Sequence, residues 1–186
     1  MLDLTNSALI GKGGIRSCYR HPSNPDLCIK IFHTWNKKIK RRSDREIKYI
    51  NFYKSPLKNF HLIPNYYGRT KTNFGDGYIF ERIKDYDGND SERLSDYIGK
   101  FNNKDEARLL IIQMYYEFLN NKILVSDLHS KNILVQMDDI SSEPKLILVD
   151  GFGNSDFIKI CDFSNFFMKM KLKRKFNRLM KELNLQ

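Results

Sequence analysis

One stretch of the chain combines an acid, an amide and an apolar run at a spacing that could do chemistry. It reads Ser-Asp-Leu-His-Ser-Lys-Asn-Ile-Leu-Val over residues 126–135, so Asp127 stands five residues before Asn132. Such a carboxylate can accept or orient the proton of a hydroxyl group, and the amide can bind a magnesium ion that carries phosphates. Polar loops with Asp and Asn also occur as plain turns. The run into an apolar strand favours a catalytic loop, with Asp127 as the base and Asn132 as a metal ligand.

A second acid follows the next apolar run. Residues 146–149 are apolar and lead into Asp150-Gly151-Phe152-Gly153, and Asp150 comes eighteen residues after Asn132. A carboxylate at this position can chelate magnesium across the β- and γ-phosphates of a nucleotide. An isolated Asp-Gly pair is more often a simple turn, so its meaning depends on the rest of the chain.

A glycine cluster near the start of the chain could approach phosphate. Gly11, Lys12, Gly13 and Gly14 lie between two strand-like runs, and the missing side chains would let backbone N–H groups come close to a phosphate. A glycine-rich hairpin turn would look the same. The cluster is not a Walker A loop, because no Lys-Ser/Thr pair follows it to open a helix.

A lysine and a glutamate downstream form a candidate ion pair. Lys30 lies in the middle of the apolar run Cys28–Phe32, where an ammonium group is costly unless it meets an anion. An edge strand that lets Lys30 reach water is the plainer alternative. Glu46 shares the apolar face of the next helical segment with Ile39 and Ile50. We expect Glu46 to orient Lys30, and Lys30 to hold the α- and β-phosphates of a nucleotide.

These five features follow one another in the order found in protein kinases. Three departures limit the match. Val125 and Ser126 replace the His-Arg that precedes the catalytic aspartate, and Asp150 is followed by Gly-Phe-Gly rather than directly by Phe-Gly. Only 36 residues follow Asp150, which we expect to be too few for an Ala-Pro-Glu segment and the helical platform that binds protein substrates. The pattern predicts an α+β fold of reduced, two-lobed, protein-kinase-like type.

The elements that must position these residues divide into a β-rich first part and a mainly helical second part. In the first part we expect strands at residues 8–10, 15–20 and 27–32, a helix at 36–54, and a hairpin of 66–72 with 78–83 that turns at Gly75-Asp76-Gly77. In the second part we expect helices at 92–100 and 104–121, a loop at 123–132, strands at 133–136 and 145–149, and a basic amphipathic helix at 163–183.

The chain is expected to form a single domain with an N-lobe at about residues 1–82, carrying one helix, and a minimal C-lobe at about 83–186. Phe80, Glu81 and Ile83 would then lie at the hinge between the lobes and bind adenine through their backbone.

Composition narrows the class of protein. Hydrophobic residues make up 41% of the chain, which argues against disorder, and no apolar stretch reaches the roughly 18 residues of a membrane span. The first residues do not resemble a signal peptide, and three cysteines without CxxC spacing fit a reducing cytoplasm. The net charge of +10 favours polyanionic partners such as nucleotide phosphates.

The basic helix near the end of the chain has two interpretations. Its bases flank an apolar stripe, so it could contact an acidic protein or an anionic lipid surface. The plainer interpretation, which we prefer, is a helix docked by that stripe with a solvated basic face. Nucleic acid ranks lower, because few aromatic residues are interleaved for base stacking. The bases are Lys169, Lys171, Lys173, Arg174, Lys175, Arg178 and Lys181.

Nearly the whole chain resembles the bacterial YrbL family of PhoP regulatory network proteins. The most distinctive match is Gly-Lys-Gly at 11–13, Arg-Ser-Cys-Tyr-Arg-His-Pro at 16–22 and Cys-Ile-Lys-Ile at 28–31. Further matches are Arg45–Tyr49, Ile63–Gly68, Gly75–Tyr78, Asp85–Gly88, Asn121–Val125 and Lys131–Leu134. The resemblance implies a protein-kinase-like fold. The catalytic-loop string is also similar to that of small-molecule kinases such as aminoglycoside phosphotransferases.

The sequence therefore predicts an ATP- and Mg²⁺-dependent phosphotransferase that acts on a hydroxyl group of a protein, sugar or lipid. The presence of Asp127 favours activity. Two alternatives stay open: a nucleotide-binding pseudokinase that regulates a partner protein, and a kinase-like nucleotidyltransferase that binds ATP in reverse.

Overall fold

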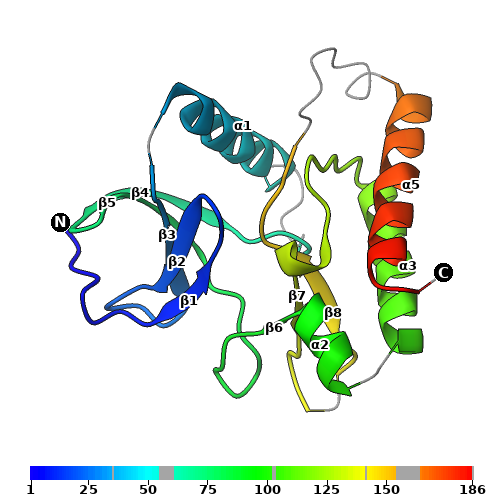
Figure 1. Ribbon diagram of the computed structural model, residues 1–186, viewed down its shortest axis with the longest axis horizontal. Helices are drawn as coiled ribbons and strands as arrows, with labels where there is room; N and C mark the ends of the chain where they lie inside the picture. Colours follow the sequence, from blue (N-terminus) through cyan, green and yellow to red (C-terminus); the bar gives the residue numbers. More distant parts are fainter. Residues whose placement is uncertain (35, 55–60, 102–103, 141, 154–163, 186) are drawn as a thin grey trace. The chain divides into compact units, whose positions relative to one another are not determined.

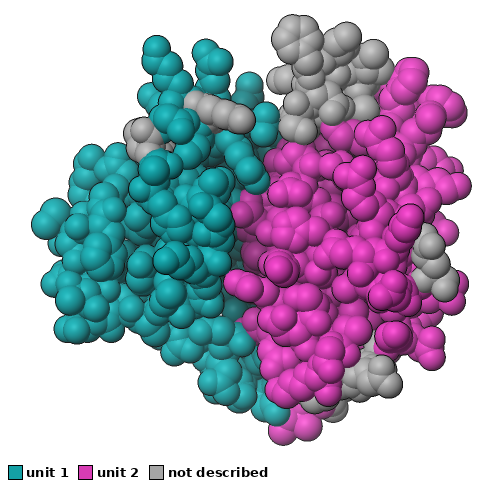
Figure 2. Space-filling model, viewed as in Figure 1, with its two compact units in different colours: residues 1–58, 64–90 teal, residues 59–63, 91–186 magenta. Residues whose placement is uncertain are grey.

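The computed structural model describes residues 1–34, 36–54, 61–101, 104–140, 142–153 and 164–185 (Figure 1). The chain divides into two compact units, of residues 1–58 with 64–90 and of residues 59–63 with 91–186 (Figure 2). The sequence placed the first boundary near residue 82. The first unit extends to Asp90, which forms an ion pair of 2.5 Å with the buried Arg82 of the same unit.

The first unit contains a five-stranded antiparallel sheet with β3 at its centre. The strand order is β1-β2-β3-β5-β4, with β1 at Leu9–Lys12, β2 at Arg16–Arg20, β3 at Leu27–Phe32, β4 at Tyr66–Thr72 and β5 at Gly75–Glu81. Side chains alternate between the two faces of a strand. Ile29 and Ile31 therefore share one face, where they pack with Leu4 in a buried cluster, and Lys30 lies on the other face.

The hairpin of β4 and β5 turns earlier than the sequence predicted. Thr72 pairs with Gly75, so Asn73 and Phe74 form the turn, and the expected turn at Gly75-Asp76-Gly77 is wrong. Gly77 instead lies inside the sheet. A Cβ atom there would come within 2.7 Å of a methyl carbon of Ile29, so this glycine makes room for the core.

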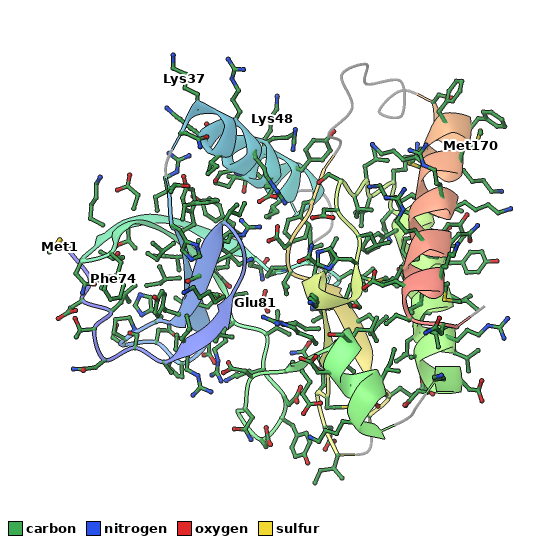
Figure 3. The ribbon with its side chains drawn as sticks, viewed as in Figure 1. Met1, Lys37, Lys48, Phe74, Glu81 and Met170 are labelled. Carbon is green, nitrogen blue, oxygen red and sulfur yellow. The ribbon has the colours of Figure 1, made fainter. Side chains whose placement is uncertain are left out.

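Helix α1 spans Lys37–Lys54, and its bases Lys37, Lys40, Arg41 and Lys48 are exposed. The side chain of Asn36 accepts a hydrogen bond of 3.0 Å from the Ile39 N–H, which is an N-cap contact. Ser43, Glu46 and Ile50 are buried. Figure 3 shows Lys37 and Lys48 extending from the helix away from the sheet.

The second unit contains a three-stranded antiparallel sheet and several helices. The strand order is β6-β7-β8, with β6 at Glu92–Arg93, β7 at Ile133–Gln136 and β8 at Lys145–Leu148. The helices are α2 at Leu94–Phe101, α3 at Lys104–Asn120, the short 3₁₀ helix η1 at Ser130–Asn132 and α5 at Asn165–Glu182. The helix expected from residue 92 begins two residues later, because Glu92 and Arg93 pair with β7.

Helices α3 and α5 lie side by side (Figure 1). The Phe176 ring of α5 meets Tyr115 and Phe118 of α3 edge-on, with centroid distances of 5.3 and 5.9 Å. The expectation that α5 docks by an apolar stripe is confirmed, and the buried stripe contains Met168, Leu172, Phe176 and Leu179. Within the described ranges, no helix has both the length and the apolar character to cross a membrane. The expected α+β class is confirmed.

Candidate functional site

The predicted catalytic loop and the Asp150 segment lie against each other in the second unit. The N–H groups of Ser126 and Asp127 both donate to the Gly151 carbonyl, at 2.8 and 3.3 Å. Val149 N–H donates to the Asn132 carbonyl at 2.8 Å, so the contact continues to the far end of the loop. Asp127, Asn132 and Asp150 are thereby held on two backbone segments that are hydrogen-bonded to one another.

Gly151 is required by this crossing for two reasons. Its φ of +83° lies in the left-handed region, and a Cβ atom would come within 2.3 Å of the Asp127 carbonyl oxygen. No side chain fits in that space. The departure Asp-Gly-Phe-Gly is therefore a structural demand of this chain, since the residue after Asp150 must let the backbone of Asp127 approach.

The amide of Asn132 is oriented by its own loop. Its Nδ2 donates to the Asp127 carbonyl at 3.2 Å, which leaves Oδ1 as the amide atom suited to a cation. Asp150 Oδ1 accepts the Gly151 N–H at 2.6 Å. Carboxylate and amide oxygens are hard ligands of the kind that Mg²⁺ prefers, usually together with water and substrate phosphates. These two side chains fit a magnesium ion bound with a nucleotide.

The Asp127 carboxylate is accessible. Its side chain is 52% exposed, and His129 Nε2 lies 3.9 Å from its Oδ2. An accessible carboxylate on a fixed backbone can receive the proton of an incoming hydroxyl group. With its imidazole protonated, His129 would be a cationic partner of the Asp127 carboxylate.

Helix α5 contacts the predicted catalytic loop at two points. Lys175 Nζ donates to the Ser126 carbonyl at 2.5 Å, directly before Asp127. Glu182 Oε1 accepts from the Ser130 N–H at 3.2 Å and from the Ser130 hydroxyl at 2.5 Å, at the start of η1. Burial lowers the pKa of Lys175, and Arg178 and Lys171 lower it further, while Asp127 acts in the opposite direction.

Lys30 is buried at the centre of the sheet in the first unit. Its residue is 8% exposed, and Nζ lies 4.4 Å from the centroid of the Phe80 ring, which is a cation–π distance. Cys18 and Tyr78 face Lys30 from the neighbouring strands. The edge-strand alternative is therefore wrong, because β3 has a partner strand on each side.

The described ion pairs of Glu46 are with two arginines. Its Oε2 lies 3.1 Å from Nη1 of Arg16, and its Oε1 lies 3.3 Å from Nε of Arg42. Arg16 is in register with Phe32 on β3, so Glu46 reaches the face of the sheet that carries Lys30. A contact of Glu46 with Lys30 itself stays a prediction.

Two thiols border Lys30 on the same face. The hydrogen bond with Cys28 lowers the pKa of the Cys18 thiol against the effect of burial, and Lys30 and Arg16 support the lowering. The same hydrogen bond and burial raise the pKa of the buried Cys28. Cys28 Sγ also lies 3.6 Å from the Glu81 carbonyl oxygen, to which it can donate.

The glycine cluster forms the β1–β2 turn. Gly11 and Lys12 belong to β1, and Gly13 N–H donates to the Arg16 carbonyl at 2.8 Å. A Cβ atom at Gly14 would meet nothing within 4 Å, and one at Gly13 would make an ordinary contact of 3.5 Å. Within the chain, then, neither packing nor a positive φ requires glycine at these two positions. A ligand that comes close to the backbone would be a reason for glycine at positions 13 and 14.

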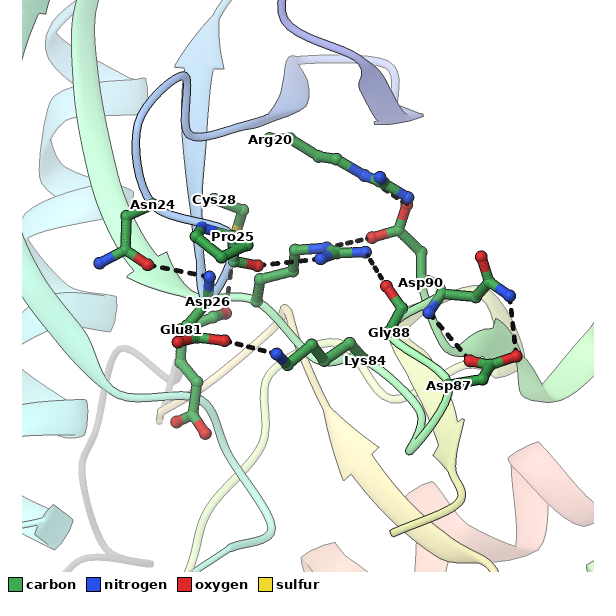
Figure 4. A network of polar contacts seen from close by, with 12 residues as sticks. Arg20, Asn24, Pro25, Asp26, Cys28, Glu81, Lys84, Asp87, Gly88 and Asp90 are labelled. Carbon is green, nitrogen blue, oxygen red and sulfur yellow. Dashed lines mark hydrogen bonds and ion pairs between the residues drawn. The ribbon is translucent and has the colours of Figure 1, made fainter. Parts of the chain in front are cut away.

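The expected hinge residues lie at the end of β5 and just after it. Phe80 is buried, and Glu81 is tied to Asn65, which donates to its carboxylate at 2.8 and 2.9 Å and accepts its N–H at 2.9 Å. Ile83, two residues after Glu81, is also buried. The segment that bears it is anchored by Arg82, which donates to the carbonyls of Pro25 and Gly88 and to Asp90. Figure 4 shows Pro25, Gly88 and Asp90 of this network, together with Arg20, which also donates to Asp90.

The sequence reasoning missed three sets of partners. Arg42 lies four residues before Glu46, a helical spacing that could have indicated the pair. The bond of Arg82 to Pro25, the pair of Arg16 with Glu46 and the α5 contacts join residues far apart in the sequence, and no local pattern indicates them.

Comparisons with known proteins agree with this fold. A family model described as PhoP regulatory network protein YrbL matches residues 2–184. YrbL of Escherichia coli (strain K12) is 29% identical over 181 residues, which cover 96% of this chain and 86% of that protein, and YrbL of Shigella flexneri matches by the same measures. A crystal structure of a kinase domain has a TM-score of 0.65 at 18% identity and covers 98% of this chain. The chain spans 65% of that kinase chain, and the predicted kinase-like fold is confirmed.

Proposed function

Because the chain belongs to the YrbL family of PhoP regulatory network proteins and has a kinase-like fold, we propose that it is an ATP- and Mg²⁺-dependent phosphotransferase that acts on a hydroxyl group. The observation that carries the proposal is the crossing at Gly151, which holds the backbone of Asp127 against the segment of Asp150.

The roles in the second unit follow from the atoms that each residue presents. Asp127 is the base that takes the proton of the acceptor hydroxyl, since its carboxylate is accessible. Asn132 and Asp150 would hold the magnesium ion through Oδ1 of the amide and the carboxylate. When bound, the ion neutralises charge on the transferred phosphoryl group. Lys175 and Glu182 keep the loop in place from α5.

The roles in the first unit concern nucleotide. Lys30 would neutralise the α- and β-phosphates, and the backbone of Gly11, Lys12, Gly13 and Gly14 would cover them. The Glu81 N–H is already bonded to Asn65. Of the three hinge residues Phe80, Glu81 and Ile83, we therefore assign the backbone contact with adenine to Ile83. Glu46 holds Arg16 on the Lys30 face and would orient Lys30 from there.

Mass spectrometry of the purified protein after incubation with ATP and Mg²⁺ tests the proposal. We expect a mass increase of one phosphate on the protein or on an added hydroxyl acceptor, with production of ADP, and far less transfer by Asp127→Asn. An adduct of AMP would assign nucleotidyl transfer instead. Nucleotide binding without any transfer would favour a pseudokinase that regulates a partner. Absence of nucleotide binding under all metal conditions would contradict all three.

A further inference from the structure

The outward side of α5 carries large apolar side chains that the docked stripe does not use. Phe166 is 67% exposed, Phe167 47% and Met170 55%. Figure 3 shows Met170 at the outer side of the helix. The two phenylalanine rings meet edge-on, with a centroid distance of 5.5 Å. Three such side chains within the first two turns of one helix form an apolar cluster in contact with water.

The same side of the helix is basic. At 100° per residue, Phe166, Met170 and Phe167 span an arc of about 100°. Arg174 falls inside this arc, Lys173 lies about 20° and Lys169 about 60° beyond its edge, and all three bases are exposed. Two other bases of the helix face inward, since Lys171 is buried and Lys175 donates to the catalytic loop. The one acid of α5, Glu182, is bonded to Ser130. We call Phe166, Phe167, Lys169, Met170, Lys173 and Arg174 the outer α5 face.

We propose that the outer α5 face binds the surface of an anionic lipid bilayer. A helix lying in the membrane interface needs aromatic or aliphatic side chains that enter the boundary of the headgroups, and bases beside them that contact lipid phosphates. The outer α5 face supplies both on one side, while the opposite side of the helix is packed on α3. A nucleic acid or an acidic peptide would account for the bases and leave the apolar cluster without a partner.

The inference goes beyond the proposed function and does not depend on it. Vesicle binding needs neither nucleotide nor an acceptor, and the side chains involved are not those that contact the catalytic loop. A negative result in one experiment therefore does not decide the other.

Vesicle co-sedimentation of the full chain tests the inference. We expect binding to vesicles of phosphatidylcholine with phosphatidylglycerol and little binding to phosphatidylcholine alone. Binding should weaken with added salt, because the Debye length falls from about 10 Å at 0.1 M to about 3 Å at 1 M. The triple variant Phe166→Ser/Phe167→Ser/Met170→Ser and the double variant Lys173→Glu/Arg174→Glu should each bind about tenfold more weakly or worse.

Two control variants make comparable substitutions outside the outer α5 face. Tyr67 and Tyr86 are 58% and 54% exposed, so Tyr67→Ser/Tyr86→Ser removes a comparable exposed aromatic surface. Lys37→Glu/Lys48→Glu on α1 reverses the same number of charges. Both controls should bind like the wild type, and melting curves should show that all variants fold. Equal losses in a control and in its α5 counterpart, or no binding to anionic vesicles, would overturn the inference. So would vesicle binding that survives the triple variant, or binding only to polyglutamate or duplex DNA.

Discussion

Single residues of the candidate site differ in how strongly the fold constrains them. Gly151 is fixed by a carbonyl that leaves no room for a Cβ atom, whereas Gly14 has nothing within 4 Å of that position. Asp127 has its backbone bound to Gly151 while its carboxylate stays accessible. The fold therefore accounts for Gly151 and for the position of Asp127. It does not account for the chemistry of the Asp127 side chain or for glycine at position 14, which is where a ligand enters the explanation.

Asp127→Asn should separate binding from transfer. The substitution keeps the size of the side chain and cannot accept a proton, so nucleotide should still raise the melting temperature. Loss of a general base typically lowers a rate by about 10²–10⁴-fold, and phosphate transfer measured by release of ADP should fall accordingly. If nucleotide binding disappears as well, Asp127 is a metal ligand or a structural residue, and its assigned role is wrong.

Gly151→Ala should destabilise the second unit. The new Cβ atom would come within 2.3 Å of the Asp127 carbonyl oxygen at a φ of +83°. A strained backbone position of this kind costs about 1–3 kcal/mol in the free energy of unfolding, measurable by urea denaturation. Gly14→Ala is the control and should change that free energy by less than about 0.5 kcal/mol. Equal effects of the two substitutions would contradict the close approach.

The residues that the sequence could indicate are those with a local signature. Lys30 stands out because it interrupts an apolar strand, and Asp127 and Asn132 stand out because of their spacing before β7. The partners of Glu46 were harder to predict from the sequence. Arg16 lies thirty residues earlier on β2, and the contact depends on how α1 packs over the sheet. A pattern in one element cannot supply that packing.

Secondary structure was predictable where hydrophobic periodicity is regular. β3 and β7 begin and end where the apolar runs do, and α1 and α5 agree with the predicted helices to within a few residues. The β4–β5 turn was misplaced because glycines usually mark turns, whereas Gly77 is needed to accommodate Ile29. The contacts of Lys175 and Glu182 with the loop were not predictable, since they join residues 49 and 52 positions apart.

Removing the hydrogen bond from Lys175 to Ser126 should lower the rate of phosphate transfer more than it lowers nucleotide binding. In Lys175→Met the Ser126 carbonyl loses a charged donor, a hydrogen bond worth about 1.5–3 kcal/mol when the donor is ionised. We expect a lower maximal rate of transfer at saturating nucleotide, with the stabilisation by nucleotide retained. Lys175→Arg should restore part of the rate, since a donor is again present. Lys173→Met, on the outward side of the same helix, is the control and should leave the rate unchanged. A uniform loss of stability without this difference would reduce Lys175 to a packing role.

The ion pair of Arg16 with Glu46 should show a measurable coupling. Both side chains are nearly buried, at 11% and 5% exposed, so removing one leaves the other charge with fewer partners. A double-mutant cycle of Arg16→Met and Glu46→Gln should give a coupling of about 1–3 kcal/mol in the free energy of unfolding. The same cycle with Lys30→Met in place of Arg16→Met tests the predicted Lys30–Glu46 contact, and simple additivity there would argue against it.

At the scale of the whole molecule, the residues that we propose for nucleotide and magnesium are divided between the two units. Lys30 and the glycine cluster belong to the first unit, and Asp127, Asn132 and Asp150 belong to the second. Neither unit contains the full set of groups that a nucleotide triphosphate with magnesium requires in a kinase. The proposed function therefore requires residues from each unit.

Thermal melting with and without ATP and Mg²⁺ tests that demand. At a ligand concentration one hundred times the dissociation constant, binding to the folded state stabilises it by about 2.7 kcal/mol, which raises the melting temperature. Lys30→Met in the first unit and Asp150→Asn in the second should each remove most of this rise, because each takes away a charge that faces the phosphates or their cation. Lys37→Met, which removes an exposed charge from α1, should leave the rise intact. If only one of the two site substitutions affects the rise, the nucleotide is bound by one unit alone. The kinase-like arrangement of these residues would then be wrong, even though the fold itself is kinase-like.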